Sequence, residues 1–408
     1  MSASHETPAA APPLLRPRHG HAKVTNEELF FDLIYAFAVT QLSHRLLEHL
    51  DPLTALQTLV LWFAVWLGWQ YTSWITNWFN PEHRSVRTML FVLMLLGLAM
   101  AAAIPDAYGE RGLAFAACYV ALQVGRSAFA LAAVSRSASS AEQRALRDNF
   151  GRILGWVCIS GVLWACGAFA QGPARLAWWA AAVLCEYVSP MLGFRLPGLG
   201  RSDPARDWTI DGGHLAERCQ LFVIVALGES ILATGAGFAA SPHWDGATLA
   251  ALASAFAGSV AMWWVYFDTG SRDGTAAIEH ADEPGRIGAY FHYIHVTLIA
   301  GVIVSAVADE LVLHHPHERV DAAAAAVLIG GPLIYLLGNA AYKRVVYGAL
   351  PLSHLAGIGL LAALAPLGWA ADRLTMGALT SAVLIVVAAW QSRHPRALPA
   401  RAGRGASH

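Results

Sequence analysis

Long apolar stretches alternate with short polar connections from about residue 28 to residue 391. The stretches are about 20 residues long, which is the length of helix that crosses the hydrocarbon core of a bilayer. They lack the polar–apolar alternation of membrane β-strands, and a helix is the other structure that satisfies its own backbone in lipid. We therefore predict an all-α, polytopic bundle of about twelve membrane-spanning helices, near residues 28–48, 54–77, 87–105, 113–134, 150–170, 175–194, 215–238, 246–268, 286–308, 322–342, 351–368 and 374–391.

Composition agrees with a membrane protein. The chain is 56% hydrophobic and 13% charged, whereas soluble domains carry about 25% charged residues. The net charge of -1 does not suggest a nucleic-acid partner. The five cysteines lie in apolar stretches without a CxxC pair, so we predict neither a disulfide framework nor a structural zinc site. The expected partners are the lipid bilayer and a small solute or ion that the sequence does not identify.

Lys and Arg residues are distributed unevenly between the two sides of the predicted bundle. With the N-terminus inside, 20 of the 27 lie in inner tails and loops and five lie in outer loops. Cytoplasmic loops of membrane proteins carry the excess of positive residues. The bias therefore predicts that both termini are cytoplasmic and that the number of spans is even.

The predicted bundle divides into two similar halves, residues 26–200 and 201–392. Four short segments recur in order at offsets of 189 to 199 residues, beginning with ELFFDLIYAFAVTQLS at Glu28 and ERCQLFVIVALGESIL at Glu217. Parallel repeats of this kind occur in transporters, with the site between the halves. The alternative is chance similarity among apolar segments. Residues 1–25 and 393–408 are expected to be disordered cytoplasmic tails.

Ionisable residues inside spans are costly in lipid and usually face the bundle interior, so they are the candidate site residues. Glu28 and Asp32 are four residues apart on one face of the first span, and Tyr35 continues that face. This pattern predicts a proton or cation site at the inner mouth. The alternative is that acidic residues at a helix N-terminus simply favour the helix dipole.

The seventh span carries a second set of candidates. Glu217 and Arg218 lie near its inner end, and Glu229 with Ser230 lies near the membrane midplane. A carboxylate at that depth is protonated, hydrated or paired across helices, so we predict a proton, ion or substrate role. Arg126, in the fourth span, needs a counter-charge, and we expect it to pair with Glu28, Asp32 or Glu217, either as a structural ion pair or as a substrate anchor.

Histidines and aromatic residues form a secondary group. His292 and His295 are three residues apart on one face of the ninth span, a spacing suited to haem, a metal ion or a proton relay. The alternative is a pair of hydrogen-bonded core histidines, so no cofactor is predicted outright and the metal remains unknown. Trp69 and Trp264 occupy matching positions in the two halves and either line a pocket or pack.

The segments VTNEELFFDLIYAFAVTQLSH and AERCQLFVIVALGESILATG resemble the bacterial low temperature requirement A (LtrA) family of integral membrane proteins. The resemblance covers most of the chain in length and hydropathy. The resemblance implies a multi-pass protein of the bacterial inner membrane. The positions that match the family's two motifs are Glu28, Asp32, Glu217, Arg218, Gly228, Glu229 and Ser230. The family is named for a growth requirement in the cold, so the resemblance implies a fold class more than an activity.

Several functions are compatible with these patterns. A secondary transporter or permease, with proton coupling as one option, is favoured by the repeat, the even span count and the buried charges. The alternatives are a redox or metal protein that uses His292 and His295, and a membrane protein that supports growth in the cold without transport. The sequence does not favour an enzyme that acts on a lipid or isoprenoid, because it contains no DDxxD motif. It predicts no nucleotide site either, because it contains no P-loop and no GxGxxG after a strand.

Overall fold

The computed structural model describes residues 12–16, 23–136, 140–203, 210–268, 270–279, 281 and 283–394. Within these ranges the chain is helical and contains no named strand. The first half comprises α1 (Asn26–Glu48), α2 (Pro52–Trp78), α3 (Arg84–Ala103), η1 (Ile104–Asp106), α4 (Gly112–Ser135), α5 (Ala141–Phe169) and α6 (Gly172–Met191). The second comprises α8 (Gly212–Ala240), α9 (Gly246–Phe267), α10 (Gly270–Glu279), α11 (Pro284–His314), α12 (Ala322–Tyr347), α13 (Leu352–Leu364), η2 (Ala365–Trp369) and α14 (Arg373–Arg393).

Every predicted span coincides with one of these helices, although α5 begins earlier than expected and α10 was not predicted. Among the described residues, nine helices are long and apolar enough to cross a membrane: α2, α3, α4, α5, α8, α9, α11, α12 and α14. The helices α1, α6 and α13 complete the predicted set of twelve but fall outside this group. The protein is thus an all-helical membrane protein, and the count of twelve spans stays a prediction.

Acidic caps mark where many of the helices begin. Five helices (α2, α8, α9, α12 and α14) start directly after an Asp whose side chain accepts from backbone N–H groups of the first turn. Such caps satisfy donors that have no partner within the helix. At α2, hydrogen bonds from Thr54 also hold the pKa of the Asp51 carboxyl below its usual range. The boundaries therefore follow from local chemistry as well as from hydropathy.

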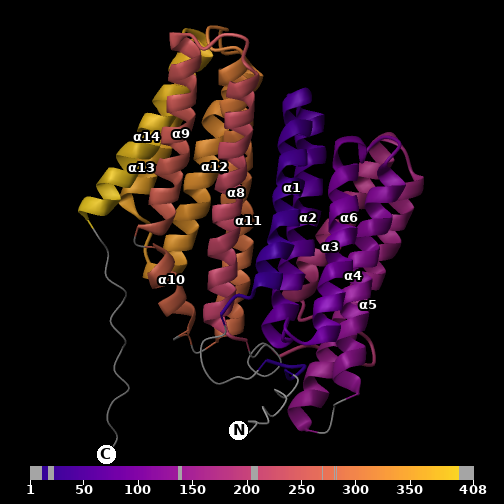
Figure 1. Ribbon diagram of the computed structural model, residues 1–408. Helices are drawn as coiled ribbons and strands as arrows, with labels where there is room; N and C mark the ends of the chain where they lie inside the picture. Colours follow the sequence, from indigo (N-terminus) through magenta and orange to yellow (C-terminus); the bar gives the residue numbers. More distant parts are fainter. Residues whose placement is uncertain are drawn as a thin grey trace, which may run out of the picture.

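The helices gather into two groups, α1–α6 and α8–α14, with α1 beside α8 and α11 where the groups meet (Figure 1). The neighbours in each group follow one order. In the first, α1 packs on α2 and α3, and α3, α4, α5 and α6 pack in succession before α6 returns to α2. In the second, α8 packs on α9 and α11, and α11, α12, α13 and α14 pack in succession before α14 returns to α9.

Two buried arginines occupy matching places in these groups. Arg175, at the start of α6, donates to the carbonyls of Ala107 and Gly109 in the connection between α3 and α4. Arg373, at the start of α14, forms a 2.6 Å ion pair with Glu318 in the connection between α11 and α12. Each arginine therefore ties the last helix of its half to the connection between the third and fourth spans of that half.

Glycines allow α11 and α12 to pack very closely. A Cβ atom at Gly338 would lie 2.7 Å from the backbone nitrogen of Leu298, and one at Gly331 would lie 2.7 Å from that of Ser305. Small residues permit such close approach of membrane helices. The pair α11–α12 is thus a tightly packed unit within the second half.

Part of the N-terminal tail is bound to the helices. Residues 12–16 pair with the end of α2, where Leu15 forms a β-bridge with Phe79 and the N–H of Arg16 donates to the Trp78 carbonyl at 2.9 Å. We expected a disordered tail over residues 1–25, and this segment differs because Leu14 and Leu15 pack on the core. Residues 1–11, 17–22 and 395–408 of the two expected tails lie outside the described residues.

Candidate functional site

Glu28 is positioned by the way α1 begins. Thr25 caps the helix, and its backbone N–H and its hydroxyl donate to Glu28 Oε2 at 2.9 and 3.1 Å. The Glu28 N–H in turn donates to the Thr25 hydroxyl, which completes a capping box. The box holds one carboxylate oxygen at the helix start and leaves the other, Oε1, free to contact the second half of the molecule.

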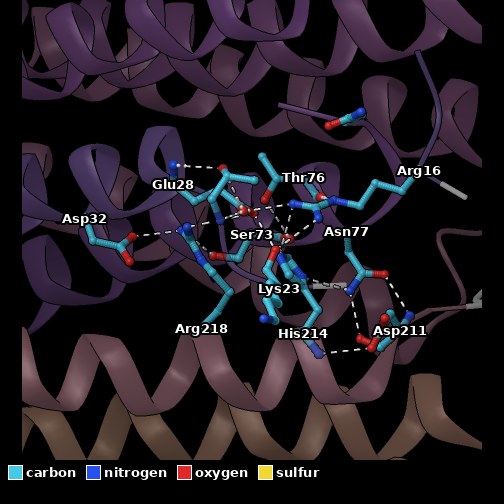
Figure 2. A network of polar contacts seen from close by, with 12 residues as sticks. Arg16, Lys23, Glu28, Asp32, Ser73, Thr76, Asn77, Asp211, His214 and Arg218 are labelled. Carbon is cyan, nitrogen blue, oxygen red and sulfur yellow. Dashed lines mark hydrogen bonds and ion pairs between the residues drawn. The ribbon is translucent and has the colours of Figure 1, made fainter. Parts of the chain in front are cut away.

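Two polar pairs join α1 to α8. His214 Nε2 lies 2.9 Å from Glu28 Oε1, and Arg218 Nη2 donates to Asp32 Oδ1 at 2.8 Å. All four side chains are buried. Glu28 and Asp32 are four residues apart, as are His214 and Arg218, so each helix presents both of its members on one face. The two halves are therefore connected by complementary pairs at matching spacing (Figure 2).

α2 contributes a third row of polar groups to this network. Trp69 Nε1 donates to Asp32 Oδ1 at 2.7 Å, and the Ser73 hydroxyl accepts from Arg218 at 3.3 Å. Asn77 exchanges hydrogen bonds with the backbone of Asp211 and lies 3.1 Å from His214 Nδ1. Trp69, Ser73 and Asn77 recur every four residues, so a single face of α2 supports both polar pairs.

Arg16 covers the end of the network that lies at the start of α1 (Figure 2). Its Nη2 forms a 2.8 Å ion pair with Glu28 Oε2 and lies 3.4 Å from His214 Nε2. Its Nε donates to the Thr76 carbonyl at 2.7 Å. The docked tail segment thus places a cation over the contact between α1 and α8.

Several buried polar atoms around Asp32 make no hydrogen bond with the described residues. They are Oδ2 of Asp32, Nε and Nη1 of Arg218, Nε1 of Trp66 and Nε2 of His292. Burying such a group without a partner is costly, so native structures rarely leave it so. These atoms come from both halves and are therefore the groups best placed to bind a proton, water or polar ligand at their boundary.

A second contact between the halves lies further along the same two helices. The Thr40 hydroxyl on α1 donates to Glu229 Oε1 on α8. Glu229 lines a cavity of about 10 Å³, the size of a single water, together with Ser230, Ser43 and His44. The Ser230 hydroxyl is buried and makes no hydrogen bond with the described residues. Glu229 is therefore a part-buried carboxylate in a polar, water-sized site.

Apolar and aromatic side chains separate the two contacts. Thr40 is eight residues beyond Asp32, a rise of about 12 Å along α1. The rings of Trp66 and Trp69 pack against Phe222 at 5.5 and 4.6 Å between centroids. Val39 and Ala226 close the apolar layer on the other side, beside Glu229. The seam between the halves thus has polar contacts at two levels and an apolar layer between them.

Arg126 does not pair with Glu28, Asp32 or Glu217 as we expected. It donates to the Gly68 carbonyl and the Thr72 hydroxyl at 3.1 Å, and to Gln123 Oε1. Gln123 in turn donates to the buried Glu186 at 2.8 Å. The described residues place no carboxylate within ion-pair distance of Arg126, so its charge is stabilised by neutral acceptors that belong to the first half.

Glu186 is a buried carboxylate that sequence reasoning missed. Tyr119 and Gln123 of α4 donate to its Oε2 at 2.6 and 2.8 Å, and Ser160 and Trp164 of α5 donate to its Oε1 at 2.8 and 3.0 Å. The signal was present, because an isolated carboxylate in an apolar stretch is the property that selected Glu229. With four donors, the Glu186 carboxyl joins α4, α5 and α6.

His292 and His295 face different neighbours. His292 hydrogen-bonds the Gly288 carbonyl and packs against the Trp69 ring. His295 hydrogen-bonds the Phe291 carbonyl and lies 2.7 Å from the Tyr266 hydroxyl. Within the described ranges no three His, Cys, Asp or Glu residues come together as a metal site. The two imidazoles therefore contribute separately to the packing of α11, and a cofactor there stays an untested alternative.

The remaining candidates lie at the edge of the network. Tyr35 is buried beside Phe31, and its hydroxyl makes no hydrogen bond with the described residues. Glu217 is half-buried on α8. Trp264 is 44% exposed and donates to Ser392 at 2.8 Å, so it faces away from the seam. Trp69, its counterpart in the first half, lies within the seam.

His214 and Arg16 are members of the network that the sequence did not reveal. His214 was missed because a histidine in the first turn of a helix carries no signal by itself. It becomes informative only when its four-residue spacing from Arg218 is compared with the four-residue spacing of Glu28 and Asp32. Arg16 was missed because it lies in a segment that resembles a flexible tail. Both are recognised only once α1 and α8 are placed side by side.

Comparisons with known proteins identify relatives over most of the chain. A family model described as "Bacterial low temperature requirement A protein (LtrA)" matches residues 23–389. An uncharacterised protein of Rhizobium meliloti (strain 1021) is 37% identical over 370 residues, which cover 90% of this chain and 89% of the relative. No solved structure matches the chain.

Proposed function

The chain belongs to the bacterial low temperature requirement A family of membrane proteins, and we propose that it is a secondary transporter whose two halves move against each other. The observation that carries this proposal is the seam between α1 and α8. Its polar contacts lie at two levels and cross from one half to the other, Glu28 and Asp32 with His214 and Arg218, and Thr40 with Glu229.

The arrangement of the helices supports two structurally related halves. The order of neighbours in α1–α6 is the order in α8, α9, α11, α12, α13 and α14. Arg175 and Arg373 also make matching connections in the two halves. Both features favour a parallel repeat of six spans over chance similarity, and transporters with such repeats bind their substrates between the halves.

Each polar contact serves as a gate in this proposal. Contacts at both levels are made in the present structure, and the layer around Phe222 separates them. Rocking of one half against the other would break one contact while the other persists. The buried groups that make no hydrogen bond, such as Asp32 Oδ2, would gain partners when solute or water enters.

Glu229 is the proposed proton-coupling group. When ionised, its carboxylate accepts the Thr40 hydrogen bond across the seam, and a protonated carboxyl is a weaker acceptor. Proton binding would therefore weaken the contact at that level and favour its opening. We further propose an inner-membrane location with both termini cytoplasmic, so that the Glu28 level faces the cytoplasm and Glu229 lies nearer the outer side.

The test requires no knowledge of the substrate. Spin labels at Arg84 and Arg272, both exposed, report the separation of the halves at the Glu28 end, and labels at Glu48 and Ala240 report the opposite end. Electron–electron distance measurements in lipid nanodiscs should yield two populations at each end. When acidification lengthens the Glu48–Ala240 distance, the Arg84–Arg272 distance should shorten.

Glu229→Gln should abolish this pH response without unfolding the protein. Glu27→Gln is the control, because it neutralises a carboxylate that pairs with Arg87 within the first half and does not reach across the seam. A single distance at both ends at every pH would contradict alternating access. A pH response that survives in Glu229→Gln would contradict the coupling role while leaving alternating access in place.

A further inference from the structure

A cavity of about 160 Å³ lies where α2 and the end of α6 meet the start of α11. It therefore lies between the two halves, and its position is separate from the polar seam of α1 and α8. Aromatic rings supply much of its wall: Tyr71 and Trp74 from α2, Phe194 from the turn after α6, and Tyr293 from α11. Tyr293 also donates to the Tyr187 carbonyl at 3.2 Å and so ties α11 to α6 beside the cavity.

A buried polar group of α2 lines this cavity. Gln70 is 7% exposed, yet its Oε1 makes no hydrogen bond with the described residues. An amide oxygen can only accept a hydrogen bond. A ligand that satisfies Gln70 must therefore carry an N–H or O–H donor.

The turn after α6 supports the wall with an unusual backbone. Gly193 and Phe194 both have positive φ angles, 61° and 47°. Glycine adopts this conformation readily, but a bulky residue such as Phe seldom does. Hydrogen bonds to Ser189 and Ser202 hold the turn, and the Phe194 ring forms part of the cavity wall. Backbone strain of this kind is found at ligand sites more often than elsewhere.

We infer that this cavity binds a flat, uncharged aromatic or heteroaromatic molecule that donates one hydrogen bond to Gln70. The volume matches a single ring with a few further atoms, since an engineered cavity of about 150 Å³ in another protein holds benzene. The inference rests on the proposed function only in taking this molecule to be the transported substrate. The ligand class itself follows from the cavity.

The charges near the cavity disfavour a cationic ligand, even though aromatic walls can bind cations. The cavity-lining residues described here include Arg286 at the mouth and no acidic side chain. The guanidinium of Arg126 lies 5.2 Å from the centre of the Tyr71 ring. A compact anion is also disfavoured, because Arg286 already pairs with Glu283 at 3.0 Å and the interior of the cavity is aromatic.

Equilibrium dialysis of the purified full chain in detergent tests the inference with three probes. Indole has the required ring and N–H donor, N-methylindole lacks the donor, and tetramethylammonium is a cation of similar bulk. Indole should bind saturably above the level taken up by empty micelles. N-methylindole should bind about tenfold more weakly, because the buried amide oxygen then stays unsatisfied.

Two variants make the result specific to this cavity. Gln70→Leu keeps the size of the side chain and should remove the preference for indole over N-methylindole. Ala289→Trp should fill the cavity and abolish binding of both, and its melting temperature shows whether it folds. Equal affinity of indole and N-methylindole for the unmodified protein, indole binding that survives in folded Ala289→Trp, or tighter binding of tetramethylammonium would each overturn the inference.

The two sets of experiments distinguish failure of the ligand-binding inference from failure of the transporter proposal. The spin-label distances report motion of the halves without any ligand, so motion without indole binding would remove the ligand class and leave the transporter. Specific indole binding to a protein whose ends do not move would establish the site and remove transport.

Discussion

At the scale of single residues, the main feature of this protein is a set of buried charges that are paired between halves. Asp32 and Arg218 are both fully buried and 2.8 Å apart. A buried pair contributes less to stability than its distance suggests, because both ions lose their hydration. Removing one partner is much more damaging, since it leaves a single charge without compensation. We therefore interpret the pair as a contact between the halves in which neither charge can be removed alone, rather than as a large source of stability.

Asp32→Asn should lower the melting temperature strongly, because it leaves the buried Arg218 guanidinium with only the longer ion pair to Glu28, at 3.9 Å. Removing one partner of a buried pair costs about 3–5 kcal/mol. Asp32→Asn combined with Arg218→Gln should restore most of that loss, since the double variant contains no isolated charge. Thermal unfolding of the single and double variants gives the coupling between the two positions. Equal losses for the single and the double variant would contradict a specific pair.

Glu27→Gln provides the control for this experiment. Glu27 pairs with Arg87 at 2.8 Å, but both side chains are partly exposed. Exposed pairs contribute about 0–1 kcal/mol, so the melting temperature of Glu27→Gln should stay close to that of the unmodified protein. A large loss in this variant would indicate that acidic residues stabilise the start of α1 through the helix dipole rather than through partners in α8.

At the scale of elements, hydropathy predicted the positions of the helices, and tertiary packing decided what the sequence could not. α10 was not predicted because its ten residues are too polar and too few to be distinguished from a loop. The carboxylates Glu28 and Asp32 were identified because charge inside an apolar stretch is rare. Their partners were not, because the choice among Arg126, His214 and Arg218 depends on which helix lies beside α1.

The contact between α11 and α12 leads to a prediction about packing. Gly338→Ala should lower the melting temperature, because the added Cβ would lie 2.7 Å from the Leu298 backbone nitrogen and the backbone would have to shift. Gly330→Ala, on the same helix, should be neutral or stabilising, since no atom lies within 4 Å of a Cβ added there. Thermal unfolding of both variants in one detergent measures the difference. Equal effects would show that α11 and α12 do not approach as closely as described.

At the scale of the whole molecule, the number of spans depends on α1, α6 and α13, the three predicted spans outside the group of nine, and α13 is the shortest of them. Its path is defined by the helices around it. The start of α14 lies beside the connection between α11 and α12, where the N–H groups of Arg373 and Leu374 donate to the carbonyls of Glu318 and Pro316 at 3.0 Å. α12 leads away from that connection, so α13 and η2 together must return across the same thickness.

The combined length of α13 and η2 is sufficient for that return. Thirteen α-helical residues rise about 20 Å and five 3₁₀ residues about 10 Å, which together match a hydrocarbon core of about 30 Å. A cysteine-free version of the chain should therefore be labelled from outside the cell by an impermeant maleimide at Ala370→Cys and not at Leu350→Cys. Labelling of both positions from one side would mean that α13 does not cross, which would leave an odd number of spans and contradict cytoplasmic location of both termini.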